Sequence, residues 1–243
     1  MGRSLLLFLV LLAGTFNAAH AQFSKGQKMA GVSIGSAFFN AGTYDYTYSS
    51  ATAPFTSRTD AFGFNISPDM GWFFTDKLVL GGRVNVEYRK DKASDEENGV
   101  TFRKRTTTDI NFTAGIFARY YLEGKNVIPF VQAAFDAGTG TSKTDGFNYT
   151  TTYKETYEGK SSGGVLISPS FTIGATKMIN KSMGIDLYAG YMYTSHKKDT
   201  ELRTLRDVDF DGTIDESAMN NPTSKFRNHG FTIGAGWRLF FGK

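Results

Sequence analysis

A period-two alternation of apolar and polar residues runs through the chain after residue 22 and limits how it can fold. In "FGFNISPDMGWF", Phe62, Ile66 and Trp72 share one face, whereas Asn65 and Asp69 share the other. Such alternation predicts β-strands with one apolar face. It recurs clearly at 78–89, 109–122, 184–194 and 230–241, and with less contrast at 30–39, 127–137 and 165–176.

These roughly eight predicted strands each have ten or more residues. Strands of soluble proteins are usually nearer five or six residues long. A tilted strand that crosses a bilayer needs about 9–11 residues. The strand length therefore favours a membrane protein over a soluble sandwich or barrel, which remains the alternative.

The polar face of the predicted strands is rich in Gly, Ser, Thr and Asn, with isolated charges of both signs. A narrow closed barrel can hold such residues inside, and charges of opposite sign can pair across it. Aromatic residues near the ends of the apolar face suit the girdle of a membrane barrel. The predicted lumen charges are Arg83, Glu87, Arg89, Asp109, Arg119, Asp136, Asp186 and Arg238.

Long and short connections alternate between the predicted strands. The long ones cover 40–60, 90–106, 138–163 and 195–225, and the short ones 75–77, 123–126 and 180–182. Bacterial outer-membrane barrels have short periplasmic turns, longer extracellular loops and an even number of strands. The pattern predicts that both ends of the barrel domain lie on the periplasmic side.

The first 21 residues have the layout of a cleaved secretory signal peptide. Arg3 precedes a short apolar run, and "AHA" follows it as an Ala-x-Ala exit. We therefore expect a signal at 1–21 and a barrel domain at 22–243. The chain has no cysteine, and 27 Lys and Arg against 23 Asp and Glu is too mild an excess to favour a nucleic-acid partner.

Two segments resemble the small outer-membrane β-barrel family of OmpA, OmpX and OmpW-like proteins. "GWRLFF" near the end is similar to the signal that such proteins present to the barrel-assembly machinery, and "SPDMGWFFTDKLVLGG" looks like a hairpin that recurs among them. The resemblance implies an all-β fold, a single antiparallel up-and-down transmembrane β-barrel of about eight strands with long extracellular loops. It also implies location in the outer membrane of a Gram-negative bacterium, in contact with its lipid and lipopolysaccharide.

A barrel of about eight strands is just wide enough for side chains to fill. We therefore expect a structural or binding protein whose function lies in the extracellular loops and their partner, for instance the Tyr-rich "YDYTYSS". A narrow channel for small solutes is the first alternative. A lipid A deacylase or acyltransferase is the second, with Ser195, His196 and His229 near Asp199 and Glu201, although no Gly-x-Ser-x-Gly elbow is present. We expect no enzyme activity.

The segment "DVDFDGTIDE" has the spacing of a calcium loop. Asp207, Asp209 and Asp211 match ligand positions one, three and five, and Gly212 fits the sharp turn at six. The carbonyl of Thr213 and the side chain of Asp215 match positions seven and nine, but Ala218 stands where a closing Glu is usual. The sequence therefore makes Ca²⁺ a candidate cofactor, and the alternative is that the segment is a solvated acidic turn.

Overall fold

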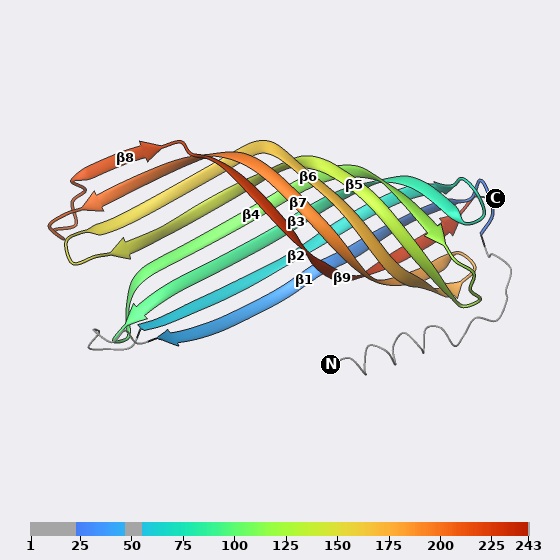
Figure 1. Ribbon diagram of the computed structural model, residues 1–243, viewed down its shortest axis with the longest axis horizontal. Helices are drawn as coiled ribbons and strands as arrows, with labels where there is room; N and C mark the ends of the chain where they lie inside the picture. The colour runs from blue at the N-terminus through green and yellow to red at the C-terminus, as the bar shows by residue number, and fades with distance from the viewer. Residues whose placement is uncertain (1–22, 47–54, 243) are drawn as a thin grey trace.

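The computed structural model describes residues 23–46 and 55–242, and almost all of them lie in β-strands (Figure 1). The predicted signal at 1–21 lies outside these residues. Within them, no helix is long and apolar enough to cross a membrane. The strands are β1 Lys28–Tyr46, β2 Phe55–Phe73, β3 Leu78–Glu97, β4 Val100–Tyr121, β5 Val127–Tyr149, β6 Lys154–Asn180, β7 Met183–Asp207, β8 Glu216–Asn220 and β9 Thr223–Phe241.

Every strand pairs antiparallel with its neighbour, and β9 closes the ring by pairing with both β1 and β7. The short β8 pairs with β7 beyond the end of β9, so β8 and β9 form one edge interrupted at Asn221 and Pro222. Pro222 cannot donate a backbone hydrogen bond, but its carbonyl accepts one from the Thr200 amide at 3.0 Å. The predicted eight-stranded up-and-down barrel is confirmed.

The outer face of the ring carries a belt of exposed apolar side chains. Ile116 is 70% exposed, Leu187 66% and Ile233 78%. A continuous apolar surface of this extent would be unfavourable in water and is the surface that lipid chains cover. These residues belong to the face that the alternation predicted to be apolar, and the fold is a transmembrane β-barrel.

A second set of apolar side chains points inward, at the end of the barrel with the short turns. Phe23 lies within 5 Å of the ring centres of Phe73, Tyr121 and Phe240. The alternation predicted a polar inward face and left 127–137 ambiguous, because Ile128 and Phe130 share a side with Gln132 and Asp136, so the plug as a whole was missed. The buried residues of the plug are Phe23, Met29, Phe73, Val79, Phe117, Tyr121, Ile128, Phe130 and Phe240.

The long connections are present, but most of their residues form strands rather than irregular loops. The pairing of β3 with β4 continues to Glu97 and Val100, and β5 pairs with β6 up to Tyr149 and Lys154. We call the paired segments 90–107, 140–163 and 197–223 the strand extension. At 27 residues, β6 is far longer than the roughly 9–11 residues that cross a bilayer, so the extension stands beyond the membrane.

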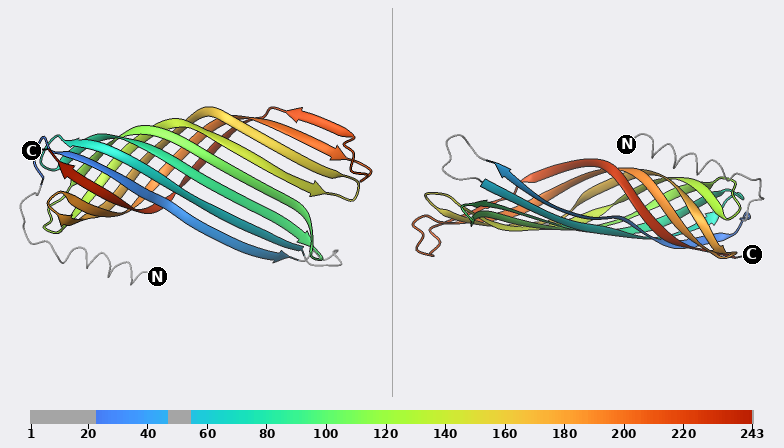
Figure 2. Two further views of the ribbon diagram at one scale, coloured as in Figure 1. Left: turned by 180° about the vertical axis from the view of Figure 1, so that it is seen from behind. Right: turned by 90° about the horizontal axis from the view of Figure 1, so that it is seen from below.

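The ring is incomplete along one seam. β1 pairs with β9 only from Lys28 opposite Phe241 to Gly35 opposite Gly234. Beyond this point β1 stays paired with β2, and β9 stays paired with β7, but β1 and β9 separate from each other (Figure 2). Phe231 lies on β9 in the parted region and is 91% exposed.

The apolar belt predicts different tolerances for charge at two equally exposed positions of β4. Ile116→Arg would place a cation in the middle of the lipid-facing belt and should lower the free energy of unfolding by about 2–4 kcal/mol. Val100, 68% exposed at the tip of the β3–β4 hairpin, is the matched control, and Val100→Arg should have little effect. Urea unfolding in lipid vesicles measures both. Equal losses would show that the belt does not face lipid.

Candidate functional site

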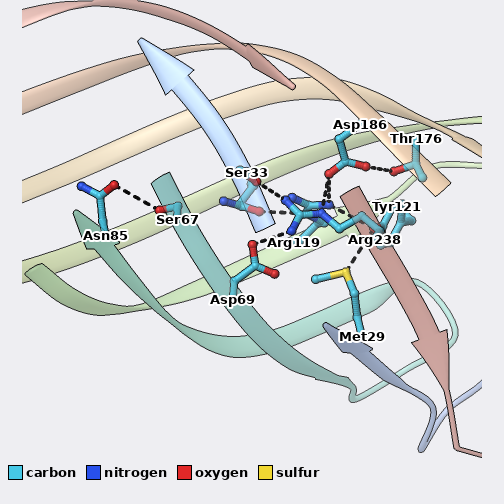
Figure 3. A network of polar contacts seen from close by, with 11 residues as sticks. Met29, Ser33, Ser67, Asp69, Asn85, Arg119, Tyr121, Thr176, Asp186 and Arg238 are labelled. Atoms are coloured by element: carbon cyan, nitrogen blue, oxygen red, sulfur yellow. Dashed lines mark hydrogen bonds and ion pairs between the residues drawn. The ribbon is translucent and has the colours of Figure 1, made fainter. Parts of the chain in front are cut away.

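Three charged side chains cross the lumen directly above the plug (Figure 3). Asp186 of β7 accepts hydrogen bonds through Oδ2 from Arg119 Nη1 of β4 and from Arg238 Nε of β9, each at 2.7 Å. Its Oδ1 accepts the Thr176 hydroxyl at 2.6 Å. All three charged residues are at most 2% exposed, so the network closes the barrel across its width.

The remaining donors of Arg238 reach β1, which pairs directly with β9, and β2, the next strand of the ring. Its Nη1 donates to Asp69 Oδ2 at 2.5 Å, and its Nη2 donates to the Ser33 hydroxyl at 2.6 Å. A Cβ atom at Gly31 would lie 2.1 Å from Arg238 Nη1, so only glycine leaves room for the guanidinium. The local sequence of β1 therefore shapes the space that Arg238 fills.

Arg119 is held equally firmly. Its Nε donates to Gln132 Oε1 at 2.8 Å, and its Nη1 also donates to the Tyr121 hydroxyl at 3.1 Å. Its guanidinium lies 4.1 Å from the centre of the Phe130 ring, which belongs to the plug. With Asp69 and Asp186, the two arginines form a set with no net charge, the condition under which buried ions are tolerated.

A small polar cavity of about 70 Å³ lies above this network. Arg83 and Asp136 form an ion pair on its wall, and Arg83 also donates to the Ser170 hydroxyl at 3.0 Å. This volume holds only a few water molecules.

The lumen prediction is confirmed for Arg119, Asp136, Asp186 and Arg238, which are buried, whereas the Arg89 side chain is 42% exposed and binds Asp91 of its own strand. Beyond the central network, Asn111 donates to Glu87 at 3.0 Å, and Lys198 donates to Asp109 at 3.5 Å. Sequence reasoning missed Asp69 as a member of the network. The signal was present, because Asp69 shares the polar face of β2 with Asn65.

The residues considered for lipid chemistry lie on both faces of the wall, with Ser195 and His229 on one face and His196 on the other. Ser195 and His196 are consecutive in β7 and point to opposite faces of the wall. His196 is buried, with Nε2 3.4 Å from the Gly163 carbonyl oxygen. Asp199 accepts the Thr223 hydroxyl at 2.6 Å, and His229 packs beside Tyr191.

The acidic motif forms the tip between β7 and β8. Carboxylate oxygens of Asp207, Asp209 and Asp215 all lie within 4.8 Å of one another. Asp211 instead accepts the Thr213 amide at 2.6 Å, and this bond holds the pKa of the Asp211 carboxyl below its usual value. The structure thus brings together three of the predicted ligands and turns Asp211 toward its own backbone.

No protein-family model matches the chain, and no curated protein matches it. Among solved structures, OprG from Pseudomonas aeruginosa is 9% identical, with 93% of this chain and 100% of that one covered and a TM-score of 0.38. A major outer membrane protein from Thermus thermophilus is 11% identical, with 87% and 99% covered and a TM-score of 0.47. AlkL in lipid bilayers is 13% identical, with 94% and 96% covered and a TM-score of 0.37. All three are described as outer-membrane proteins.

The buried network predicts a large loss of stability when its shared anion is neutralised. Asp186→Asn leaves Arg119 and Arg238 buried without their common partner and should lower the free energy of unfolding by about 3–5 kcal/mol. Asp109→Asn, which affects a half-buried pair with Lys198, should cost less than about 1 kcal/mol. Urea unfolding of both variants in detergent micelles gives the comparison. Similar small losses would show that the network does not hold the barrel wall together.

Proposed function

We propose that the chain is an integral outer-membrane barrel with a closed lumen, acting as a structural and binding protein through its strand extension. The observation that carries this proposal is the layer of Arg119, Asp186 and Arg238 across the lumen. A solute would have to break charge-assisted hydrogen bonds in a buried site and then displace the aromatic plug. The first step would leave a buried charge without its partner, and the second would expose buried aromatic side chains to water.

The strand extension offers a broad surface for a partner outside the cell. Its β5–β6 hairpin includes "SKTDGFNYTTTYKETYEGKSS", which is rich in Tyr, Thr and Ser. The Lys154 ammonium lies 5.5 Å from the Tyr149 ring, and the Arg206 guanidinium lies 5.1 Å from the Tyr153 ring. Tyr149 ends β5 and Tyr153 lies in the turn before β6. Tyrosine offers a large contact area at a small cost in conformational entropy, which favours a glycan or protein partner.

The positions of the candidate catalytic residues support a binding role over lipid hydrolysis. A nucleophile and its base must lie within hydrogen-bonding reach of each other. Ser195 and His196 point to opposite faces of β7, so neither can activate the other, and Ser195 lies opposite Arg227 rather than opposite His229 in the pairing with β9.

The seam between β1 and β9 supports a second candidate function. The lumen is blocked toward the plug, so a small molecule that enters from the extension could leave only sideways, where β1 and β9 are no longer paired. Unpaired backbone groups are unfavourable against lipid. An apolar solute passing between the barrel and the membrane would use this gap and never cross the network of Arg119, Asp186 and Arg238.

The closed lumen predicts an electrically silent protein. Refolded full-length barrel in a planar lipid bilayer at neutral pH should show no steady openings, whereas a general porin in the same bilayer should conduct. Steady openings would overturn the closed lumen. Uptake of an apolar dye into vesicles tests the second candidate separately, and uptake no faster than in protein-free vesicles would remove it.

The binding role predicts that the extension can be shortened without loss of the barrel. In one variant, an Asn-Gly turn replaces the segment Lys143–Lys160 and joins Ser142 to Ser161, which are opposite each other in the β5–β6 pairing. Heat-modifiable mobility should show a folded barrel, while binding of barrel-bearing cells to a glycan array or to host-cell surfaces should fall at least tenfold. Equal binding by the shortened variant and by the full-length barrel would show that this hairpin does not carry the binding function.

A further inference from the structure

We propose that the tip between β7 and β8 is a calcium site formed by Asp207, Asp209 and Asp215. The tip lies at the far end of the strand extension, beyond β8 in Figure 1. The site is independent of whether the lumen conducts, and it would couple the order of the extension to the divalent cations outside the cell.

The spacing of the carboxylates fits one bound ion. Calcium binds oxygen at about 2.3–2.6 Å, so oxygens on opposite sides of the ion are about 4.6–5.2 Å apart. Oxygens of Asp207, Asp209 and Asp215 lie within 4.8 Å of one another, the separation of ligands in a single shell. Asp207 and Asp209 approach from the β7 arm of the hairpin, and Asp215 approaches from the β8 arm, so the ion would tie the two arms together.

Asp207 supplies a second and independent indication of a ligand. Its side chain faces the cluster, and the residue is only 4% exposed. One carboxylate oxygen, Oδ2, accepts the Gly212 amide at 3.1 Å, but the other, Oδ1, is buried without a hydrogen-bond partner. A buried carboxylate oxygen without a partner is strongly unfavourable, and a cation in the cluster would satisfy it.

The tip lacks a positive charge of its own. The segment from Asp207 to Asp215 contains four aspartates and no Lys or Arg. The adjacent Arg206 binds Glu155 at 2.8 Å and Glu216 at 3.5 Å, so its charge is already shared by two carboxylates. Among the residues that the structure describes, no ion pair reaches the four aspartates, and their mutual repulsion would be relieved by a cation.

The backbone holds the three ligands in place before any ion binds. The Val208 amide donates to Asp215 Oδ2 at 2.7 Å, and the Asp211 amide donates to Asp209 Oδ1 at 3.2 Å. Phe210 and Gly212 adopt φ angles of 62° and 87°, which curl the chain around the cluster. Ordering the loop therefore costs less when the ion arrives, because much of it is already folded.

The donor set favours calcium over the other common divalent ions. All the ligands are carboxylate oxygens, whereas zinc and copper sites draw on His or Cys, and the chain has no cysteine. Asp209 and Asp215 are exposed, so water can complete the seven or so oxygen contacts that calcium takes and that the smaller magnesium ion does not need. Three carboxylates and an open shell correspond to a weak extracellular site, with a dissociation constant of about 10⁻⁴–10⁻³ M.

The test is calorimetric titration of the refolded full-length barrel with calcium chloride in detergent micelles. We expect one calcium per chain. Asp207→Asn and Asp209→Asn should each weaken binding at least tenfold, because each removes a charged ligand while keeping an oxygen that can accept the backbone hydrogen bond. Asp211→Asn is the matched control, since Asp211 lies in the same loop but outside the cluster, and it should change the affinity less than threefold.

Limited proteolysis and heat-modifiable mobility test the site in two further ways. Limited proteolysis should cleave within 207–215 more slowly in calcium than in chelator, and magnesium at the same concentration should protect less. Heat-modifiable mobility confirms that each variant is folded. The site would be overturned if the titration gave no heat at ten-millimolar calcium and cleavage were identical in calcium and in chelator. It would also be overturned if Asp211→Asn weakened calcium binding as much as Asp207→Asn does.

Discussion

The architecture depends on one constraint, that a strand in lipid must find a hydrogen-bonding partner on both edges. β9 meets this requirement by pairing with β7 along its length and with β1 over Lys28–Gly35. Ring closure at that short ladder turns a sheet into a barrel and sends alternate side chains to lipid and to the lumen. The seam above Gly35 is the place where the constraint is relaxed, because β1 and β9 are no longer paired there.

Closure also decides what the lumen must contain. An eight-stranded ring leaves room for side chains but little for water, so any charge inside must be neutralised by another. Asp186 does this for Arg119 and Arg238 together, and Asp69 supplies the second anion. Because these residues come from four strands, the same bonds that neutralise the charges also tie opposite walls of the barrel together. The same residues therefore stabilise the barrel and close its lumen.

The sequence was most informative where lipid lies on one side of a strand and the lumen on the other. There the two faces differ in polarity, and the alternation assigned Ile116 outward and Arg119 inward correctly. It failed for the plug, because Phe130 and Phe240 are apolar inward residues, and hydrophobicity alone does not separate an apolar lumen from lipid. It also failed for the extension, where both faces of the strands meet water and no alternation is required. The candidate calcium ligands were predicted by spacing, but the turn of Asp211 toward the Thr213 amide depends on local backbone geometry that spacing does not contain.

The extension poses a physical problem that the membrane part of the barrel does not have. Its strands bury no lipid-facing surface, so backbone ladders and side-chain bridges must supply most of their order. The bridge from Glu155 through Arg206 to Glu216 joins β6, β7 and β8 just below the tip, but it is partly exposed, and such pairs contribute little in water. A cation at the tip would act where this support ends, and it would add a further link between the β7 and β8 arms of the hairpin. The acidic tip is thus the point at which the proposed cation would change the order of the strand extension.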